Sequence, residues 1–190
     1  MAATVGLWDH FRRLLDFKGR EDRASFWPYA ALAFVIITVA GMVVFIPMMS
    51  RTMRAMQEYA AQNPDQATID SGAGQYSITV EGHHPGFFDG GAMALFLGLT
   101  FGLAILLYAA AVVRRLHDRG KSGFWGLMPL PFIIYSSIMM PRMFTSMSDP
   151  NMSLFFSVSL SNMLYIVTLI WLIVILAGPS EPVPSQQGVK

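Results

Sequence analysis

The sequence contains no cysteine, and charged residues make up only 13% of its 190 positions. Without cysteine, disulfides and thiolate metal sites are excluded. A soluble domain carries about 25% charged residues, so the low charge content argues against the ordinary globular class. The net charge of +1 provides no overall basic face, and no nucleic-acid partner is predicted.

The apolar residues instead gather in long blocks. Four segments contain no Asp, Glu, Lys or Arg: Trp27–Ser50, Gly90–Val113, Ser122–Pro141 and Pro150–Ser180. About 20 apolar residues cross the hydrocarbon core of a bilayer as a helix. We therefore predict an all-α membrane protein, a four-transmembrane-helix bundle with spans near 27–49, 91–113, 123–141 and 155–176. A buried helical hairpin in a soluble protein is the alternative.

Residues 1–26 precede the first span and are predicted to be a cytoplasmic or interfacial segment. Apolar residues recur there at helical spacing, with polar residues between them: Leu7, Trp8, Phe11, Leu14 and Leu15 against Asp9, Arg12, Arg13 and Asp16. This pattern predicts a short amphipathic helix. It lies in the membrane interface or packs on the protein's own loops.

The distribution of Lys and Arg predicts the orientation. Of the 13 Lys and Arg residues, those before the first span, those at 114–121 and Lys190 lie on one side. The positive-inside rule places that side in the cytoplasm. Both termini are then cytoplasmic, and 178–190 is a cytoplasmic tail. Its three prolines make it a poor candidate for order.

The same orientation makes residues 51–89 the one larger external loop, and this loop is net acidic. Arg51–Gln62 can continue the first span as a helix, Asn63-Pro64-Asp65 is typical of a turn, and Gln75–Val80 alternates like a short strand or half hairpin. His83 and His84 are adjacent and have no obvious further ligand nearby, so no metal site is predicted.

The turn between the second and third spans, Arg114–Trp125, is the most distinctive stretch. Two arginines at a helix C-terminus meet the negative end of the helix dipole, Gly120 suits a left-handed helix stop, and Ser122 can cap the next helix. Asp118 is within pairing reach of Arg114 and Arg115. The stretch is either a well-built hairpin or an anionic headgroup site with His117 and Asp118 as proton-handling groups.

A second stretch, Phe17–Trp27, precedes the first span and also ends in Phe-Trp. Its Gly-Arg-x-x-Arg-x-x-Phe-Trp pattern, paired with the later Arg-Arg-Leu-His-Asp-x-Gly-Lys-Ser-Gly-Phe-Trp turn, resembles the bacterial domain of unknown function 805 family. These are small inner-membrane proteins without assigned biochemistry. The resemblance carries over to Gly19, Arg20, Arg23, Phe26, Trp27 and Arg114 to Trp125, with position 119 variable.

Two departures from that family stand out. Its members usually have a shorter external connection, so residues 51–89 resemble an insertion. They also tend to end in a Gly-x-Asn-x-Tyr/Phe-Gly tail, whereas the segment from Gly178 to Gly188 lacks the asparagine and the aromatic residue.

The spans contain no ionisable side chain other than tyrosine, which argues against proton-coupled transport and intramembrane hydrolysis. Ala94, Gly98 and Gly102 form a small-xxx-small line for close helix packing, within the bundle or between subunits. Pro129 and Pro131 are expected to kink the third span or break its first turns.

We therefore expect a membrane module, not assigned as an enzyme and without a cofactor, whose cytoplasmic basic surface contacts anionic lipid headgroups or a partner protein. Membrane lipids, a membrane-protein partner and a homo-oligomer are the candidate partners. The contact residues would be Arg20, Arg23, Arg114, Arg115, His117, Asp118 and Lys121. The structural motif residues would be Gly19, Phe26, Trp27, Gly120, Ser122, Gly123 and Trp125. The alternative is a carrier or enzyme for a phosphorylated lipid at the same surface, with His117 and Asp118 as its acid–base pair.

Overall fold

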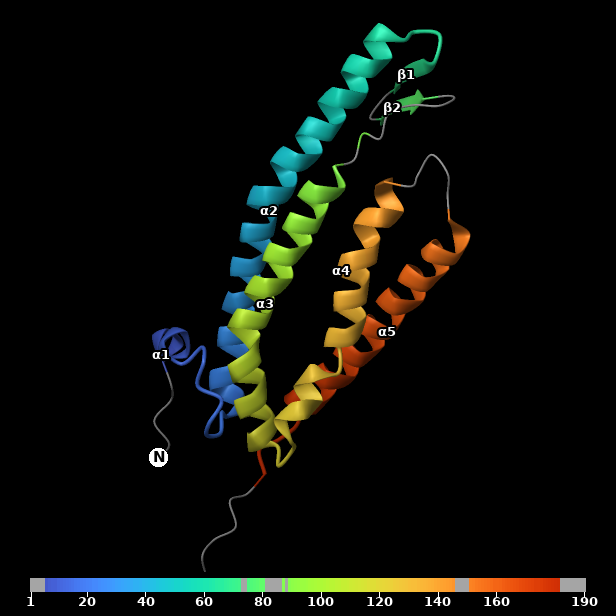
Figure 1. The fold of residues 1–190 in the computed structure, drawn as a ribbon. Helices are drawn as coiled ribbons and strands as arrows, with labels where there is room; N and C mark the ends of the chain where they lie inside the picture. The colour runs from blue at the N-terminus through green and yellow to red at the C-terminus, as the bar shows by residue number, and fades with distance from the viewer. Residues whose placement is uncertain (1–5, 73–74, 81–86, 88, 146–150, 182–190) are drawn as a thin grey trace, which may run out of the picture. The chain divides into compact units, whose positions relative to one another are not determined.

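The structure is a computed structural model that describes residues 6–72, 75–80, 87, 89–145 and 151–181. His83 and His84 lie outside these residues. The described elements, in chain order, are α1 (Leu7–Arg12), α2 (Arg23–Gln62), β1 (Ala67–Gly72), β2 (Gln75–Val80), α3 (Gly90–Asp118), a 3-10 helix (Gly123–Leu127), α4 (Leu130–Thr145) and α5 (Met152–Ala177) (Figure 1).

Four stretches are long and apolar enough to cross a membrane: Arg23–Gln62, Gly90–Asp118, Gly123–Phe144 and Met152–Ala177. In the most apolar 18-residue window of each, only 17% of the residues are buried. Large side chains such as those of Phe34, Val43 and Val174 are 65%, 68% and 65% exposed. Apolar surface of this extent suits contact with lipid rather than water. The chain is thus a multi-pass membrane protein, and its helices run beyond the predicted spans.

The helix α2 is 40 residues long, about 60 Å at 1.5 Å per residue. It confirms the predicted continuation of the first span to Gln62. A turn follows, in which the Gln66 amide donates to Asn63 O at 3.0 Å. Antiparallel β1 and β2 then pair Ala67 with Val80 and Ile69 with Ile78. The predicted strand at Gln75–Val80 is confirmed, so the described chain contains one hairpin besides its helices.

The third membrane stretch is interrupted as its prolines predict. Gly123–Leu127 forms a 3-10 helix, and α4 begins only at Leu130. Proline lacks an amide hydrogen and its ring clashes with the preceding turn of a helix. Pro129 and Pro131 are therefore placed where a helix begins, and Pro141 is the proline inside α4.

The chain divides into two compact units, which are described separately. Unit 1 comprises residues 1–37, 101–133 and 162–190, and unit 2 comprises 38–100 and 134–161. The core of unit 1 is formed by alanine, leucine and aromatic side chains of α2, α3 and α5: Phe26, Tyr29, Ala30, Ala33, Leu107, Ala111, Leu116, Leu172 and Leu176.

Two tyrosines join α2 and α3 reciprocally in unit 1. The Tyr29 hydroxyl donates to Leu107 O, and the Tyr108 hydroxyl donates to Ala30 O, each at 2.7 Å. We call this pair the tyrosine clasp. Small residues at Ala30, Ala33 and Ala111 let the two backbones approach closely enough for both bonds to form.

The short helix α1 belongs to unit 1 and combines both expected placements of its apolar residues. Phe11 and Leu14 pack against the core of the unit. Trp8 and Leu15 are instead exposed, at 79% and 76%. The predicted amphipathic helix is therefore present over Leu7–Arg12 only. Leu14 and Leu15, which were expected to belong to it, lie in the turn that follows.

In unit 2, α2 and α3 meet at aromatic and small residues, with the rings of Phe45 and Phe96 5.4 Å apart. A Cβ atom on Gly41 would lie 3.7 Å from Thr100 Oγ1, an ordinary contact distance. Close packing at Gly98, and at Gly102 in unit 1, is not seen within the chain, because outside the helix's own backbone no described atom lies within 4 Å of a Cβ placed there; packing between subunits stays a prediction. These glycines face open space.

Candidate functional site

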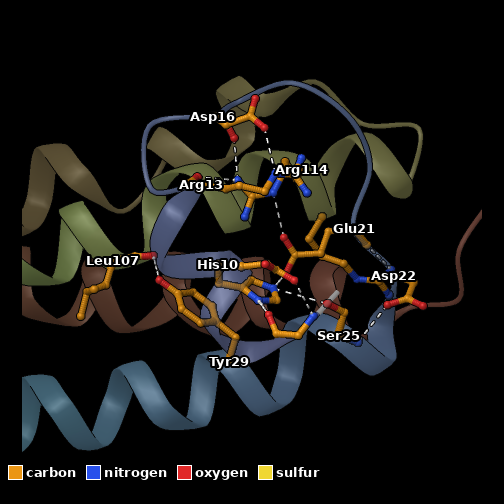
Figure 2. A network of polar contacts seen from close by, with 12 residues as sticks. His10, Arg13, Asp16, Glu21, Asp22, Ser25, Tyr29, Leu107 and Arg114 are labelled. Atoms are coloured by element: carbon orange, nitrogen blue, oxygen red, sulfur yellow. Dashed lines mark hydrogen bonds and ion pairs between the residues drawn. The ribbon is translucent and has the colours of Figure 1, made fainter. Parts of the chain in front are cut away.

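A buried carboxylate stands at the centre of a polar network in unit 1. Glu21 is 3% exposed and lies between the two helices α1 and α2. Its Oε1 lies 2.8 Å from His10 Nε2, and its Oε2 accepts from Arg114 Nε at 2.9 Å. His10 and Arg114 are each 1% exposed, and Figure 2 shows the three side chains converging. A buried charge requires such partners, because its desolvation is otherwise very costly.

The ring of His10 is held from three sides. It stacks on Tyr29 with centroids 4.4 Å apart and planes 13° from parallel. Its Nδ1 lies 3.2 Å from Gly6 O, and its Nε2 lies 3.4 Å from Ser25 Oγ besides the Glu21 contact. Gly6 O and the Glu21 carboxylate are both acceptors, so only the doubly protonated ring donates to both.

Arg114 binds the N-terminal segment through its guanidinium. Nη1 donates to Arg13 O at 3.0 Å and to Asp16 O at 2.5 Å. The backbone amide of Glu21 donates in return to Arg114 O at 3.2 Å. Arg13 Nε also donates to Asp16 Oδ2 at 2.9 Å, and this hydrogen bond lowers the pKa of Asp16 below its usual value. Residues 13–21 are thereby attached to the end of α3 (Figure 2).

Arg115 binds the end of α5, as Arg114 binds the N-terminal segment. It is 0% exposed, and it donates to Leu176 O at 3.0 Å, to Gly178 O at 2.6 Å and to Ser180 Oγ at 3.2 Å. The last carbonyls of a helix have no partner within it, and a cation there also meets the negative end of the helix dipole. Arg119 adds a bond to Ile175 O at 3.0 Å and another to Pro179 O.

Asp118 and Arg20 complete the network. The Asp118 carboxylate accepts from Arg115, three residues earlier on α3, and lies 3.5 Å from Arg20 Nε. Arg20 Nη2 donates to Asp118 O and to Glu181 O, each at 2.8 Å. The Glu181 amide donates to Asp118 O at 3.0 Å. Three distant parts of the chain therefore meet here: residues 10–25, 114–119 and 175–181.

Two glycines in the turns, Gly19 and Gly120, have backbone angles that favour glycine. Gly19 has φ +92° and Gly120 has φ +60°, which confirms the predicted left-handed stop after α3. Ser122 accepts from the Phe124 amide at 3.4 Å and so caps the 3-10 helix. A Cβ on Gly123 would lie 2.8 Å from Val113 Cγ1, so glycine is required here for close packing.

The aromatic residues of the two motifs differ in burial. Phe26 is 2% exposed, and its ring lies 5.4 Å from that of Trp27 in an edge arrangement. Trp125 is 40% exposed and its ring lies 4.9 Å from that of Trp171 on α5. Phe124 is 80% exposed, as suits a residue that contacts lipid headgroups.

Of the seven predicted contact residues, the structure brings together Arg20, Arg114, Arg115 and Asp118, while Arg23, His117 and Lys121 are exposed. The prediction that Arg114 and Arg115 belong to an exposed basic surface is wrong. Both guanidinium groups are buried because they have acceptors within the protein. Arg114 donates to Glu21 and to Arg13 O. Arg115 donates to carbonyls at the end of α5. Asp118 pairs with Arg115 as predicted, but Arg114 pairs with Glu21 instead.

The acid–base pair of the alternative prediction has no support in this geometry. Asp118 is 7% exposed and its carboxylate is engaged by two arginines, whereas His117 is exposed. Among the described residues no group of three or more His, Asp or Glu side chains is placed to hold a metal ion. The arrangement holds three segments of the chain together, residues 10–25, 114–119 and 175–181.

His10 and Glu21 were not predicted from the sequence. Glu21 was counted as a variable position between the two arginines of the Gly-Arg-x-x-Arg motif, and His10 was not assigned to either face of the amphipathic helix. One signal pointed to them: two adjacent arginines at the end of an apolar helix need acceptors. The predicted disorder of the tail is wrong for residues 178–181, which are docked by Arg20 and Arg115; residues 182–190 lie outside the described part.

Comparison with known proteins agrees with these motifs. No curated protein and no solved structure matches the chain. A family model described as "Protein of unknown function (DUF805)" matches residues 14–188, which include both motifs and, of the buried network, Glu21, Arg114, Arg115 and Asp118 but not His10. The chain belongs to the DUF805 family.

Proposed function

We propose that the protein is a non-enzymatic membrane module whose cytoplasmic end, in unit 1, binds anionic lipid headgroups. Both termini lie in the cytoplasm and the membrane is a bacterial inner membrane in this proposal. The positive-inside distribution of Lys and Arg supports the orientation. The buried network revises which residues make the contact, because Arg114 and Arg115 are 1% and 0% exposed and bind other parts of the chain.

The observation that carries the proposal is the set of charges that remain exposed around the network. These are the cationic side chains of Arg12, Lys18, Arg23 and Lys121, whereas Arg20, which is also exposed, is engaged by Asp118 and Glu181 O. Neighbouring acidic groups are occupied locally: Asp22 Oδ1 accepts from the Ser25 amide at 2.9 Å, and Asp9 Oδ2 accepts from the Gly6 amide at 3.2 Å. The cations are therefore the charges available to an anionic partner.

Exposed aromatic and aliphatic side chains accompany these cations in the same unit. Trp8, Leu15 and Phe124 are 79%, 76% and 80% exposed, and Phe17 precedes Lys18 directly. Aromatic rings beside basic residues are typical of a membrane–water interface. A surface that combines both kinds of side chain fits anionic headgroups better than it fits a soluble phosphorylated ligand.

The test compares two exposed cations of unit 1, Lys18 and Lys121, with two exposed cations of α2 in unit 2, Arg51 and Arg54. Arg51 follows Arg23 by 28 positions on this helix, about 42 Å at 1.5 Å per residue. The protein is purified from membranes holding equal amounts of phosphatidylglycerol and phosphatidylcholine, and the copurified lipids are quantified. Lys18→Gln with Lys121→Gln should lower the phosphatidylglycerol enrichment about fivefold for each cation, since each contributes about 1 kcal/mol.

Arg51→Gln with Arg54→Gln is the matched control, because both arginines are exposed and carry the same charge. This control should leave the enrichment at the cytoplasmic end unchanged. Equal enrichment in the two double variants would contradict the proposal. Tags at the two termini that react with a membrane-impermeant reagent from opposite sides would contradict the orientation.

A further inference from the structure

The segment that follows α5, residues 178–181, is bound to the end of α3 mainly through its backbone, and we call it the strap. Three of its carbonyls accept hydrogen bonds, each from a different arginine: Gly178 O from Arg115 at 2.6 Å, Pro179 O from Arg119, and Glu181 O from Arg20 at 2.8 Å. The Glu181 amide donates in turn to Asp118 O at 3.0 Å. One short segment thus occupies donors of three cations.

The acceptors that the strap provides are neutral. A guanidinium fork matches two oxygens of a phosphate, and a phosphate adds an attraction between opposite charges that a backbone carbonyl lacks. Two of the three arginines are open to solvent in part: the Arg20 side chain is 33% exposed, and Arg119 is half-buried. A phosphate can therefore compete with the strap carbonyls for these two side chains.

The strap also lowers the positive charge of this cluster. A Cβ atom on Gly120 would overlap the Glu181 carboxylate, so this acidic side chain lies directly on the turn after α3. Without the strap, the cluster holds three arginines and the carboxylate of Asp118, a net charge of +2. With the strap docked, Glu181 reduces that charge to +1. An anionic partner is thus attracted more strongly when the strap is displaced.

We propose that the strap is an autoinhibitory contact of the lipid-binding surface, displaced when the phosphate of an anionic lipid binds Arg20 and Arg119. This inference rests on the proposed contact between unit 1 and anionic lipid. While the strap is docked, the lipid meets exposed cations such as Lys18 and Lys121. Once the strap is displaced, two further guanidinium groups join them.

Displacement of the strap leaves the buried pairs of unit 1 in place. Arg115 also donates to Leu176 O, within α5, at 3.0 Å and to the Asp118 carboxylate on its own helix. Glu21 and Arg114 are bound to each other 2.9 Å apart without any strap residue between them. The helix α5 ends at Ala177, so the strap can leave without unwinding it.

The first test observes the strap in the wild-type protein. The Glu181 amide reports docking, because its proton is bonded to Asp118 O, and the Lys121 amide, bonded to Leu116 O at 2.8 Å, is the internal control. Hydrogen exchange is measured in bilayers of phosphatidylcholine alone and of phosphatidylcholine with phosphatidylglycerol. Phosphatidylglycerol should accelerate exchange at Glu181 about fivefold, the factor for one charge near an anionic surface, and leave Lys121 unchanged. Inorganic phosphate added to phosphatidylcholine bilayers should have no effect on either amide.

The second test weakens the strap without removing a cation. A Cβ on Gly178 would overlap the Arg119 guanidinium, whereas a Cβ on Gly41 in unit 2 meets its nearest neighbour at 3.7 Å. Gly178→Ala should therefore raise the ratio of copurified phosphatidylglycerol to phosphatidylcholine about fivefold, and Gly41→Ala should not change it. Glu181→Pro, which removes the amide donor to Asp118 O, should raise the ratio as Gly178→Ala does.

The outcomes separate this proposal from the one on which it rests. If the wild type showed no enrichment of phosphatidylglycerol, the lipid contact itself and the strap proposal would both fail. If the wild type were enriched but exchange at Glu181 did not respond to phosphatidylglycerol, the lipid contact would stand and the autoinhibitory role would be overturned. Equal acceleration by inorganic phosphate would overturn the assignment to lipid, and a wild-type lipid ratio in both Gly178→Ala and Glu181→Pro would overturn the autoinhibition.

Discussion

The two units satisfy their polar groups in opposite ways. In unit 1, two guanidinium groups, two carboxylates and an imidazole are buried together, and each has partners at hydrogen-bond distance. In the described part of unit 2, Gly90, Ala94 and Gly98 of α3 line a cavity of about 490 Å³. Elsewhere in the unit, Ser136 Oγ is buried without a hydrogen-bond partner. Tight polar bonding thus holds one unit, and the other has room for an additional component.

Because of this difference, substitutions in unit 1 and in unit 2 should affect the stability of the protein to different extents. A network whose members are all paired loses much when one member is removed, because the remaining charges stay buried. A unit with open space tolerates added atoms and loses little. Substitutions should therefore be severe in the network of unit 1 and mild at the cavity wall of unit 2.

The largest effect is expected for Glu21→Gln. The substitution keeps the shape of the side chain but leaves Arg114 buried without its counter-charge, which should cost about 3–5 kcal/mol. The measurement is the midpoint of thermal unfolding in detergent, followed by tryptophan fluorescence. Glu58→Gln, at an exposed position of α2 in unit 2, is the control and should remain within about 0.5 kcal/mol of the wild type.

A double variant tells whether the loss at Glu21 comes from the unpaired charge. Glu21→Gln combined with Arg114→Met removes both charges, and the double variant should be more stable than Glu21→Gln alone. If Glu21→Gln unfolded at the wild-type temperature, the network would not be the element that holds unit 1 together.

A smaller loss, about 2–3 kcal/mol, is expected for Arg115→Lys. The ammonium group retains the charge but cannot reach Leu176 O, Gly178 O and Asp118 together as the planar guanidinium does. Carbonyls left without partners are costly when buried. Backbone hydrogen exchange at residues 175–181 should accelerate in Arg115→Lys and remain unchanged in Arg54→Lys. Equal protection in the two variants would show that the docked tail does not depend on this arginine.

The smallest effects compare two glycines directly. Gly123→Ala in unit 1 should destabilise by about 2 kcal/mol, because its Cβ would lie 2.8 Å from Val113 Cγ1. Gly98→Ala in unit 2 should stabilise by about 0.5–1 kcal/mol, because alanine is the better helix former and the site is open. Thermal midpoints measured in one detergent test the opposite signs.

Val113→Ala should restore much of the stability that Gly123→Ala loses, since it removes the two methyl groups that meet the new Cβ. A loss of stability in Gly98→Ala would mean that another chain packs closely on α3, and the contrast between the units would then fail.

Local structure was predictable from the sequence where local rules determine it. The end of α2 at Gln62, the strand Gln75–Val80, the late start of α4 after Pro129 and the left-handed Gly120 all follow from short-range backbone preferences. The four apolar stretches follow from their length and composition. These features do not require knowledge of what a residue contacts elsewhere in the chain.

The network could not be predicted because its partners are distant in sequence. Glu21 and Arg114 are 93 positions apart, and Arg115 and Leu176 are 61 apart. Basic residues at the end of a span suit lipid phosphates and protein carbonyls equally well by residue type. The spacing of Gly98 and Gly102 likewise gives the potential for close packing without saying whether a helix is present there. Burial, which decides each case, depends on tertiary structure.

The tyrosine clasp has a consequence for how the helices of unit 1 can move. Sliding α2 along α3 by a single residue is a displacement of about 1.5 Å, enough to break both 2.7 Å bonds at once. In hydrocarbon no water replaces a lost partner. Any rearrangement that the protein undergoes at this point must therefore be a tilt or a rotation, with the axial register of these two helices kept constant.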